Sequence, residues 1–127
     1  MKLLAIALTA ALASHAADAQ DARPDAADGA QADISVCLAF YTIIADCIRG
    51  DGGARVALRR LAAMSAQASK VAHLPRSDAQ LRFDLNMLDQ RTLMGNNCAG
   101  LGTLRARYAD QCRALISSAP VPQGKPK

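Results

Sequence analysis

Few residues in this sequence have a type and spacing suited to catalysis. The chain has two histidines, and only His73 lies beyond the N-terminal apolar segment. A nucleophile needs a base within hydrogen-bond reach and usually a third group that orients the base. Neither G-x-S-x-G nor H-E-x-x-H is present. His73 precedes Pro75 at a helix end, where histidine usually stabilises the terminus or is solvated. The sequence predicts no catalytic residue, although an enzyme without a recognisable motif stays an alternative.

Asp46 is the most conspicuous acidic residue, because it interrupts a strongly apolar segment. We expect it to pair with Arg49 or with a basic residue of another helix rather than to act as an active-site acid. The glycine-containing segment 96–102 matches neither a P-loop nor the dinucleotide-binding fingerprint, and it follows no predicted strand. This segment is predicted to be a helix cap and a turn, so no cofactor is expected.

Cysteine spacing favours disulfide bonds over a metal site. The chain has four cysteines, which are Cys37, Cys47, Cys98 and Cys112. Their spacings are C-x9-C and C-x13-C, without the close ligand pairs that structural zinc sites usually contain. We therefore expect no metal ion. An even number of cysteines in an exported chain predicts two disulfide bonds.

The N-terminal segment has the features of a secretory signal peptide. Lys2 precedes an apolar run over 3–13, and two small-residue triads follow. A charged start, a short apolar run and an A-x-A-like site are typical of such a peptide. The run is shorter than the roughly 20 apolar residues that span a bilayer. We predict a signal peptide over 1–19, cleaved after Ala19 or alternatively after Ala16, and hence a periplasmic or secreted protein.

Charge is distributed unevenly along the chain. Residues 20–51 contain six Asp and two Arg, a net charge of −4, whereas 52–127 contain twelve Lys or Arg and four Asp, a net charge of +8. The cations suited to an anionic lipid or lipopolysaccharide surface are Arg55, Arg59, Arg60 and Lys70. Nucleic acid is not expected as a partner, because the chain has no Trp and only two Tyr and two Phe to stack bases.

The first part of the predicted exported protein contains a leader and a central helix. Residues 20–32 are rich in Ala, Asp and Gly and are expected to form a flexible acidic leader. Asp33 is the expected N-cap of a helix over 34–49, which is apolar around most of its circumference and therefore predicted to be buried. Its narrow polar strip consists of Ser35, Ala39, Thr42, Asp46 and Arg49.

Three more helices are predicted from apolar periodicity and from helix-ending residues. They cover 54–72, 77–94 and 97–116, and a disordered basic tail follows over 117–127. Ser77 and Gln80 match a capping box at the start of the third helix. Asn96 or Asn97 is the expected cap of the last helix, whose first turn is weakened by nearby glycines.

The last helical segment contains a regular apolar stripe and both Cys98 and Cys112. At about 100° per residue the stripe contains Leu101, Leu104, Tyr108, Cys112 and Leu115. Four helices joined by short loops predict an all-α fold, a small disulfide-stapled bundle in up-down-up-down order over 33–116.

This order predicts which cysteines pair. The first and last helices are then antiparallel neighbours, so Cys37 meets Cys112 and Cys47 meets Cys98. The helical rise separates the cysteines by about 15 Å on the first helix and about 21 Å on the last, which is compatible only if Cys98 lies at a frayed helix start. Pairing within either helix is excluded, because disulfide-bonded α-carbons lie about 5.5 Å apart.

The third helix has two apolar stripes where a surface helix needs one. The stripe expected to face the core consists of Leu81, Leu85, Leu88 and Thr92. The opposite stripe consists of Phe83, Met87 and Met94. One hypothesis is that other parts of the chain cover this second stripe. The other is that it is an exposed, methionine-rich interface with a second copy or another protein.

Parts of the chain resemble a protein family. The sequence is similar to a family of small exported proteobacterial helical proteins with paired cysteines, in the segments Cys37-x9-Cys47, Gly95-Asn96-Asn97-Cys98 and Tyr108-Ala109-Asp110-x-Cys112. The resemblance covers the four-helix region and rests mainly on its end. It implies export and paired cysteines, and it brings no activity with it.

Taken together, these patterns predict a non-catalytic exported protein that binds another macromolecule in the cell envelope. The expected partner is a protein, either a second copy or another envelope protein. The alternative partner is an anionic membrane surface, contacted by the basic helix over 54–72.

Overall fold

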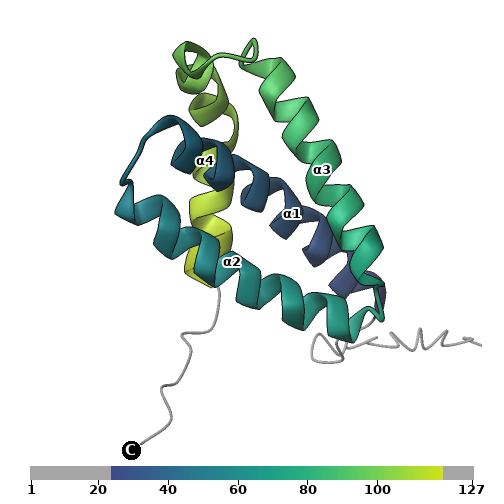
Figure 1. Cartoon of the computed structure of the whole chain (residues 1–127). Coiled ribbons are helices and arrows are strands. Elements are labelled where there is room, and N and C mark those ends of the chain that lie inside the picture. Colours follow the sequence, from purple (N-terminus) through teal and green to yellow (C-terminus); the bar gives the residue numbers. More distant parts are fainter. Residues whose placement is uncertain (1–23, 119–127) are drawn as a thin grey trace, which may run out of the picture.

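The structure is a computed structural model that describes residues 24–118. This part of the chain forms α1 (Pro24–Cys47), α2 (Gly52–Val71), α3 (Arg76–Leu93), the 3-10 turn η1 (Cys98–Gly100) and α4 (Leu101–Ser118), and it contains no strand. Consecutive helices alternate in direction (Figure 1), which confirms the predicted all-α four-helix bundle. The predicted signal peptide over 1–19 and residues 119–127 of the predicted tail lie outside the described residues.

The core is built around α1, which lies against α2, α3 and α4 (Figure 1). Its large buried side chains include Phe40 and Ile43, which are 1% and 2% exposed. They pack with Leu61 of α2 and with Leu104 and Tyr108 of α4. The rings of Phe40 and Tyr108 lie 6.2 Å apart. Burying such side chains stabilises the fold by about 1.5–3 kcal/mol each, so α1 is the main source of hydrophobic stability.

The start of α1 corrects the predicted leader. The helix begins at Pro24 rather than after Asp33, so residues 24–32 are helical instead of flexible. Proline suits the first turn because its φ is fixed and its missing N–H is not needed there. Gln31 is 1% exposed and exchanges two hydrogen bonds with Ser65 of α2, of 3.0 and 3.1 Å. Polar contacts with another helix therefore order a segment that lacks large apolar residues.

The ends of α2 and α3 are set by specific backbone and side-chain contacts. Asp51 caps α2 by accepting a 2.8 Å hydrogen bond from the Ala54 N–H. His73 follows the end of the same helix and adopts the left-handed conformation, at φ 52°. The Leu74 N–H donates a 2.9 Å hydrogen bond to the Ser69 carbonyl. This is the Schellman arrangement, which explains His73 as a helix-ending residue.

The capping box predicted for α3 does not form. The helix starts at Arg76, directly after Pro75, and no side chain caps it. The Gln80 side chain instead donates to the Asp84 carboxylate over 2.9 Å. Pro75 is extended, at φ −59° and ψ 145°, and occupies the cap position that the pattern assigned to Ser77.

Two disulfides join α1 to the last helical segment. Cys37 is bonded to Cys112 and Cys47 to Cys98, the pairs expected from the antiparallel arrangement, with α-carbons 5.4 and 5.5 Å apart. Cys98 lies in η1, before the regular helix begins. Asn97 is the residue that caps this turn, since its side chain accepts from the Ala99 N–H over 2.9 Å.

One stretch of α1, Ala26–Cys47, is long and apolar enough to cross a membrane by length and composition. In this structure the same stretch is packed inside the bundle, and two of its most buried side chains, Gln31 and Ser35, are polar and hydrogen-bonded to α2 and α3. These features are those of the central helix of a bundle.

Candidate functional site

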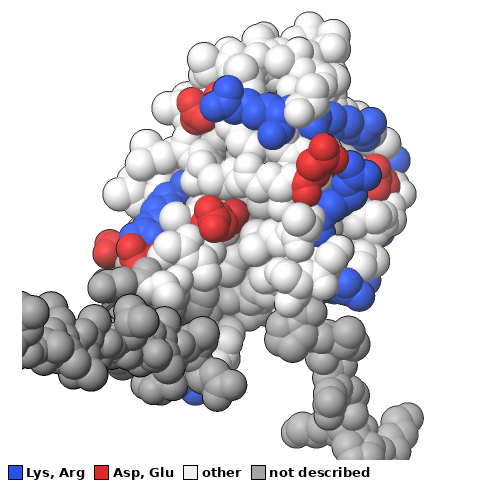
Figure 2. Space-filling view, turned by 180° about the vertical axis from the view of Figure 1, so that it is seen from behind, with Lys and Arg blue, Asp and Glu red and all other residues white. Residues whose placement is uncertain are grey.

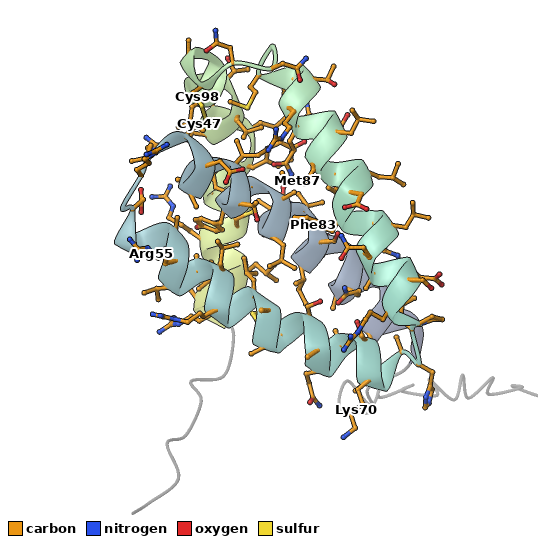
Figure 3. All side chains as sticks on the ribbon, viewed as in Figure 1. Cys47, Arg55, Lys70, Phe83, Met87 and Cys98 are labelled. Carbon is orange, nitrogen blue, oxygen red and sulfur yellow. A yellow bond between two sulfur atoms is a disulfide. The ribbon has the colours of Figure 1, made fainter. Side chains whose placement is uncertain are left out.

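The Phe83 stripe of α3 faces the inside of the molecule. Met94 is 6% exposed, Met87 packs against the core, and Phe83 is partly buried. Figure 3 shows Phe83 and Met87 between α3 and α1. The hypothesis that Phe83, Met87 and Met94 form an interface is therefore corrected, because other parts of the chain cover them.

The leucine stripe of α3, defined by Leu81, Leu85 and Leu88, points outward instead of into the core. These side chains are 57%, 57% and 65% exposed, so the predicted core role of this stripe is wrong. Thr92 continues the line, and its hydroxyl donates to the Leu88 carbonyl over 2.8 Å, which satisfies its polar group within the helix. The result is an apolar row on the outer surface of an ordered helix.

Polar groups on α1 explain why the leucines face outward. Ser35, 1% exposed, accepts a 3.2 Å hydrogen bond from the Asn86 amide. The Gln90 amide, fully buried, donates to the Val36 carbonyl over 2.8 Å. Asn86 and Gln90 lie on the same side of α3 as Phe83, and leucines could not supply these bonds. A buried polar group left unpaired costs about 1–3 kcal/mol, so the buried Ser35 hydroxyl favours the face of α3 that carries Asn86. Gln90 incurs part of this cost itself, because its side-chain oxygen is buried without a hydrogen-bond partner within the described residues.

Two ion pairs hold the edges of the contact between α3 and α1. Arg82 pairs with Asp28 at 2.6 Å, and Arg91 pairs with Asp46 at 3.1 Å. Asp46 is therefore paired with a basic residue of another helix, which is one of the two alternatives predicted from the sequence. It is not paired with Arg49. Each pair is partly exposed and contributes about 0–1 kcal/mol. Both pairs are compatible with the rotation of α3 that leaves the leucine stripe outside, and they add little to its stability.

The basic residues predicted to contact an anionic surface are all exposed along α2; they are Arg55, Arg59, Arg60 and Lys70. No salt bridge within residues 24–118 involves them. Arg55 and Lys70 lie at opposite ends of the helix (Figure 3), about 22 Å apart by helical rise, so the four cations are spread along α2 and do not form a compact site. On the opposite face of the molecule, basic and acidic groups are interspersed (Figure 2).

A shallow hollow of about 200 Å³ lies between α2 and α4, and Tyr41, Arg60 and Arg113 contribute to its lining. Arg113 pairs with Asp110 of its own helix. Burial raises the pKa of the Tyr41 hydroxyl, and the positive charge of Arg113 offsets part of the rise. Tyr41 therefore stays protonated at neutral pH and is not a base there. Within residues 24–118 no group of three or more His, Cys, Asp or Glu could hold a metal ion.

These features define a class: a small disulfide-bonded helical bundle whose third helix presents an apolar row to solvent. No family model, curated protein or solved structure matches the chain. The resemblance to small exported proteobacterial proteins therefore stays a prediction.

Proposed function

We propose that this protein is a non-catalytic, exported binding protein of the cell envelope that uses the leucine stripe to hold another protein. The observation that carries the proposal is the exposure of Leu81, Leu85 and Leu88 on a helix whose opposite face is fixed to α1. Contiguous exposed apolar groups on an ordered surface mark interaction sites. A groove or a second helix on the partner would cover such a row.

The disulfides and the N-terminal sequence support the proposed compartment. Two disulfides indicate an oxidising compartment outside the cytoplasm. The apolar segment after Lys2, with its small-residue triads, supports export to the periplasm or beyond. A binding protein there meets envelope proteins and further copies of itself.

Charge at the margins of the leucine stripe favours a protein partner over a membrane. Two acidic and two basic residues flank the leucine stripe: Arg82, Asp84, Asp89 and Arg91. Helices that lie on anionic membranes carry mainly Lys and Arg beside their apolar face. A balanced set of charges suits a protein surface, where opposite charges can be matched on both sides.

The exposed cations of α2 support a second candidate function, binding to an anionic envelope surface. Arg55, Arg59 and Arg60 have no ion-pair partner in the part of the chain that the structure describes. Affinity for anionic vesicles would then fall steeply as ionic strength rises. Contact through the leucine stripe buries apolar side chains between balanced charges and would weaken much less with salt, so a salt series separates the two candidates.

Site-specific photo-cross-linking tests the leading proposal. A photoreactive phenylalanine analogue at Leu85 is expected to give a discrete protein adduct when the intact envelope of producing cells is irradiated. The matched control carries the same analogue at Gln67, which is also exposed but lies on α2. No adduct at Leu85, or the same adducts at both positions, would contradict a binding role for the leucine stripe.

A further inference from the structure

We infer that the occupant of the leucine stripe is a second copy of this chain, with the two α3 helices packed antiparallel. This inference rests on the proposed function and names its partner. It is carried by the spacing of the apolar residues, by the charges beside them and by the position of the stripe on the fold. A symmetric dimer of this kind uses the same surface on both subunits, as most homodimers do.

The spacing is that of a helix–helix seam. Leu81, Leu85, Leu88 and Thr92 follow one another in steps of four, three and four residues. This is the a/d spacing of a two-stranded coiled coil. The row lies opposite Phe83 and Met87, which face α1 (Figure 3), so a second helix can lie along it without displacing α1. Its length is about 16 Å by helical rise, enough for a short seam.

The flanking charges select the antiparallel orientation. Arg82 and Asp89 border one side of the seam, and Asp84 and Arg91 border the other. A two-fold axis between residues 86 and 87 places Arg82 beside Asp89 of the second copy and Asp84 beside Arg91 of the second copy. Every flanking pair is then of opposite sign. A parallel seam would instead place Asp84 beside Asp89 of the second copy, which is repulsive.

The flanking side chains are exposed enough to form ion pairs with a second copy. The Arg82 and Arg91 side chains are 31% and 50% exposed in their ion pairs with α1, and each guanidinium has five N–H donors. Asp89 is exposed and makes no hydrogen bond or ion pair within residues 24–118. Since the four flanking charges sum to zero, the overall charge of +4 is not concentrated at the seam. One helix pair is small for an interface, so the dimer is expected to be weak.

Sedimentation equilibrium of the exported, disulfide-bonded protein, at concentrations from about 10 μM to about 1 mM, can detect such a weak dimer. The wild-type protein is expected to dimerise with rising concentration. A positive variant, Asp84→Arg with Asp89→Arg, and a negative variant, Arg82→Asp with Arg91→Asp, should each self-associate about tenfold or more weakly. An equimolar mixture of the two should recover dimers, because every flanking pair is again of opposite sign.

A matched control keeps the net charge change but avoids the seam. Arg55→Asp with Arg59→Asp removes the same charge as the negative variant and should leave dimerisation unchanged. The positive variant breaks no ion pair within the described residues, so its behaviour decides the question if the negative variant fails to fold. Asp89→Arg alone should weaken the antiparallel dimer, whereas stronger association would mean a parallel seam and would overturn the arrangement.

A wild-type protein that stays monomeric at about 1 mM would overturn self-association. If Leu85 then cross-linked to a different envelope protein, the proposed function would stand with another occupant. If Leu85 cross-linked to nothing, the proposed function would fail as well. A mixture of the two charge variants that dimerised no better than either alone would also overturn the inference.

Discussion

Replacing Cys37 and Cys112 by Ala is expected to lower the free energy of unfolding by about 4–5 kcal/mol. This disulfide closes a sequence separation of 75 residues, which restricts the unfolded chain strongly. Both cysteines are fully buried, so the substitution also leaves a small cavity between α1 and α4. Chemical denaturation followed by far-UV circular dichroism measures the loss.

The second disulfide is the matched comparison. Replacing Cys47 and Cys98 by Ala should cost about 3–4 kcal/mol, because the separation is 51 residues and Cys98 is exposed, so no core cavity results. Exposure also makes this bond the first to be opened by a mild reductant, while Cys37–Cys112 should survive until the bundle unfolds. Earlier reduction of Cys37–Cys112 would contradict the burial that the structure assigns to it.

Replacing Gly100 by Ala is expected to lower the free energy of unfolding by about 2–4 kcal/mol. A Cβ atom at this position would overlap the Met94 carbonyl oxygen and lie 2.7 Å from the Met94 carbonyl carbon. Both are backbone atoms, so relief requires the end of α3 and the turn before α4 to separate. Met94 is 6% exposed, and moving it would open the core. Thermal and chemical denaturation of the oxidised protein measures the effect.

Gly102 provides the control for Gly100. It lies in the first turn of α4, and a Cβ atom there would meet nothing within 4 Å. Gly102→Ala should therefore raise the free energy of unfolding by about 0.5–1 kcal/mol, since alanine favours the helix. If the two alanine variants were equally stable, the close approach of Gly100 to Met94 would have no effect on the free energy of unfolding.

The helices and their order could be predicted because local signals determine them. Apolar periodicity with glycine or proline at the helix ends marks four segments, and Gly50 and Gly95 do adopt positive φ, at 81° and 72°. The cysteine pairs then follow from helical rise and antiparallel packing alone. These properties depend on residues close in sequence or on simple geometry.

The start of α1 and the rotation of α3 could not be predicted in the same way. Residues 24–32 lack large apolar side chains, and their order depends on Ser65 and Arg82, which lie far along the chain. Both stripes of α3 are apolar enough to pack inward. The choice between them depends on Ser35 and the Val36 carbonyl of another helix. Asn86 and Gln90 beside Phe83 were the available signal, because a polar strip on a buried helix needs partners.

The stability of paired substitutions on the two faces of α3 tests most directly whether the leucine stripe lies outside the core, where it is free to bind. Measured at a concentration low enough to keep the protein monomeric, Leu85→Ser should change the free energy of unfolding by less than about 0.5 kcal/mol. Met87→Ser, on the face that packs on α1, should lower it by about 1–3 kcal/mol. A large loss for Leu85→Ser with little change for Met87→Ser would place the leucines in the core and would contradict a binding surface on this face of α3.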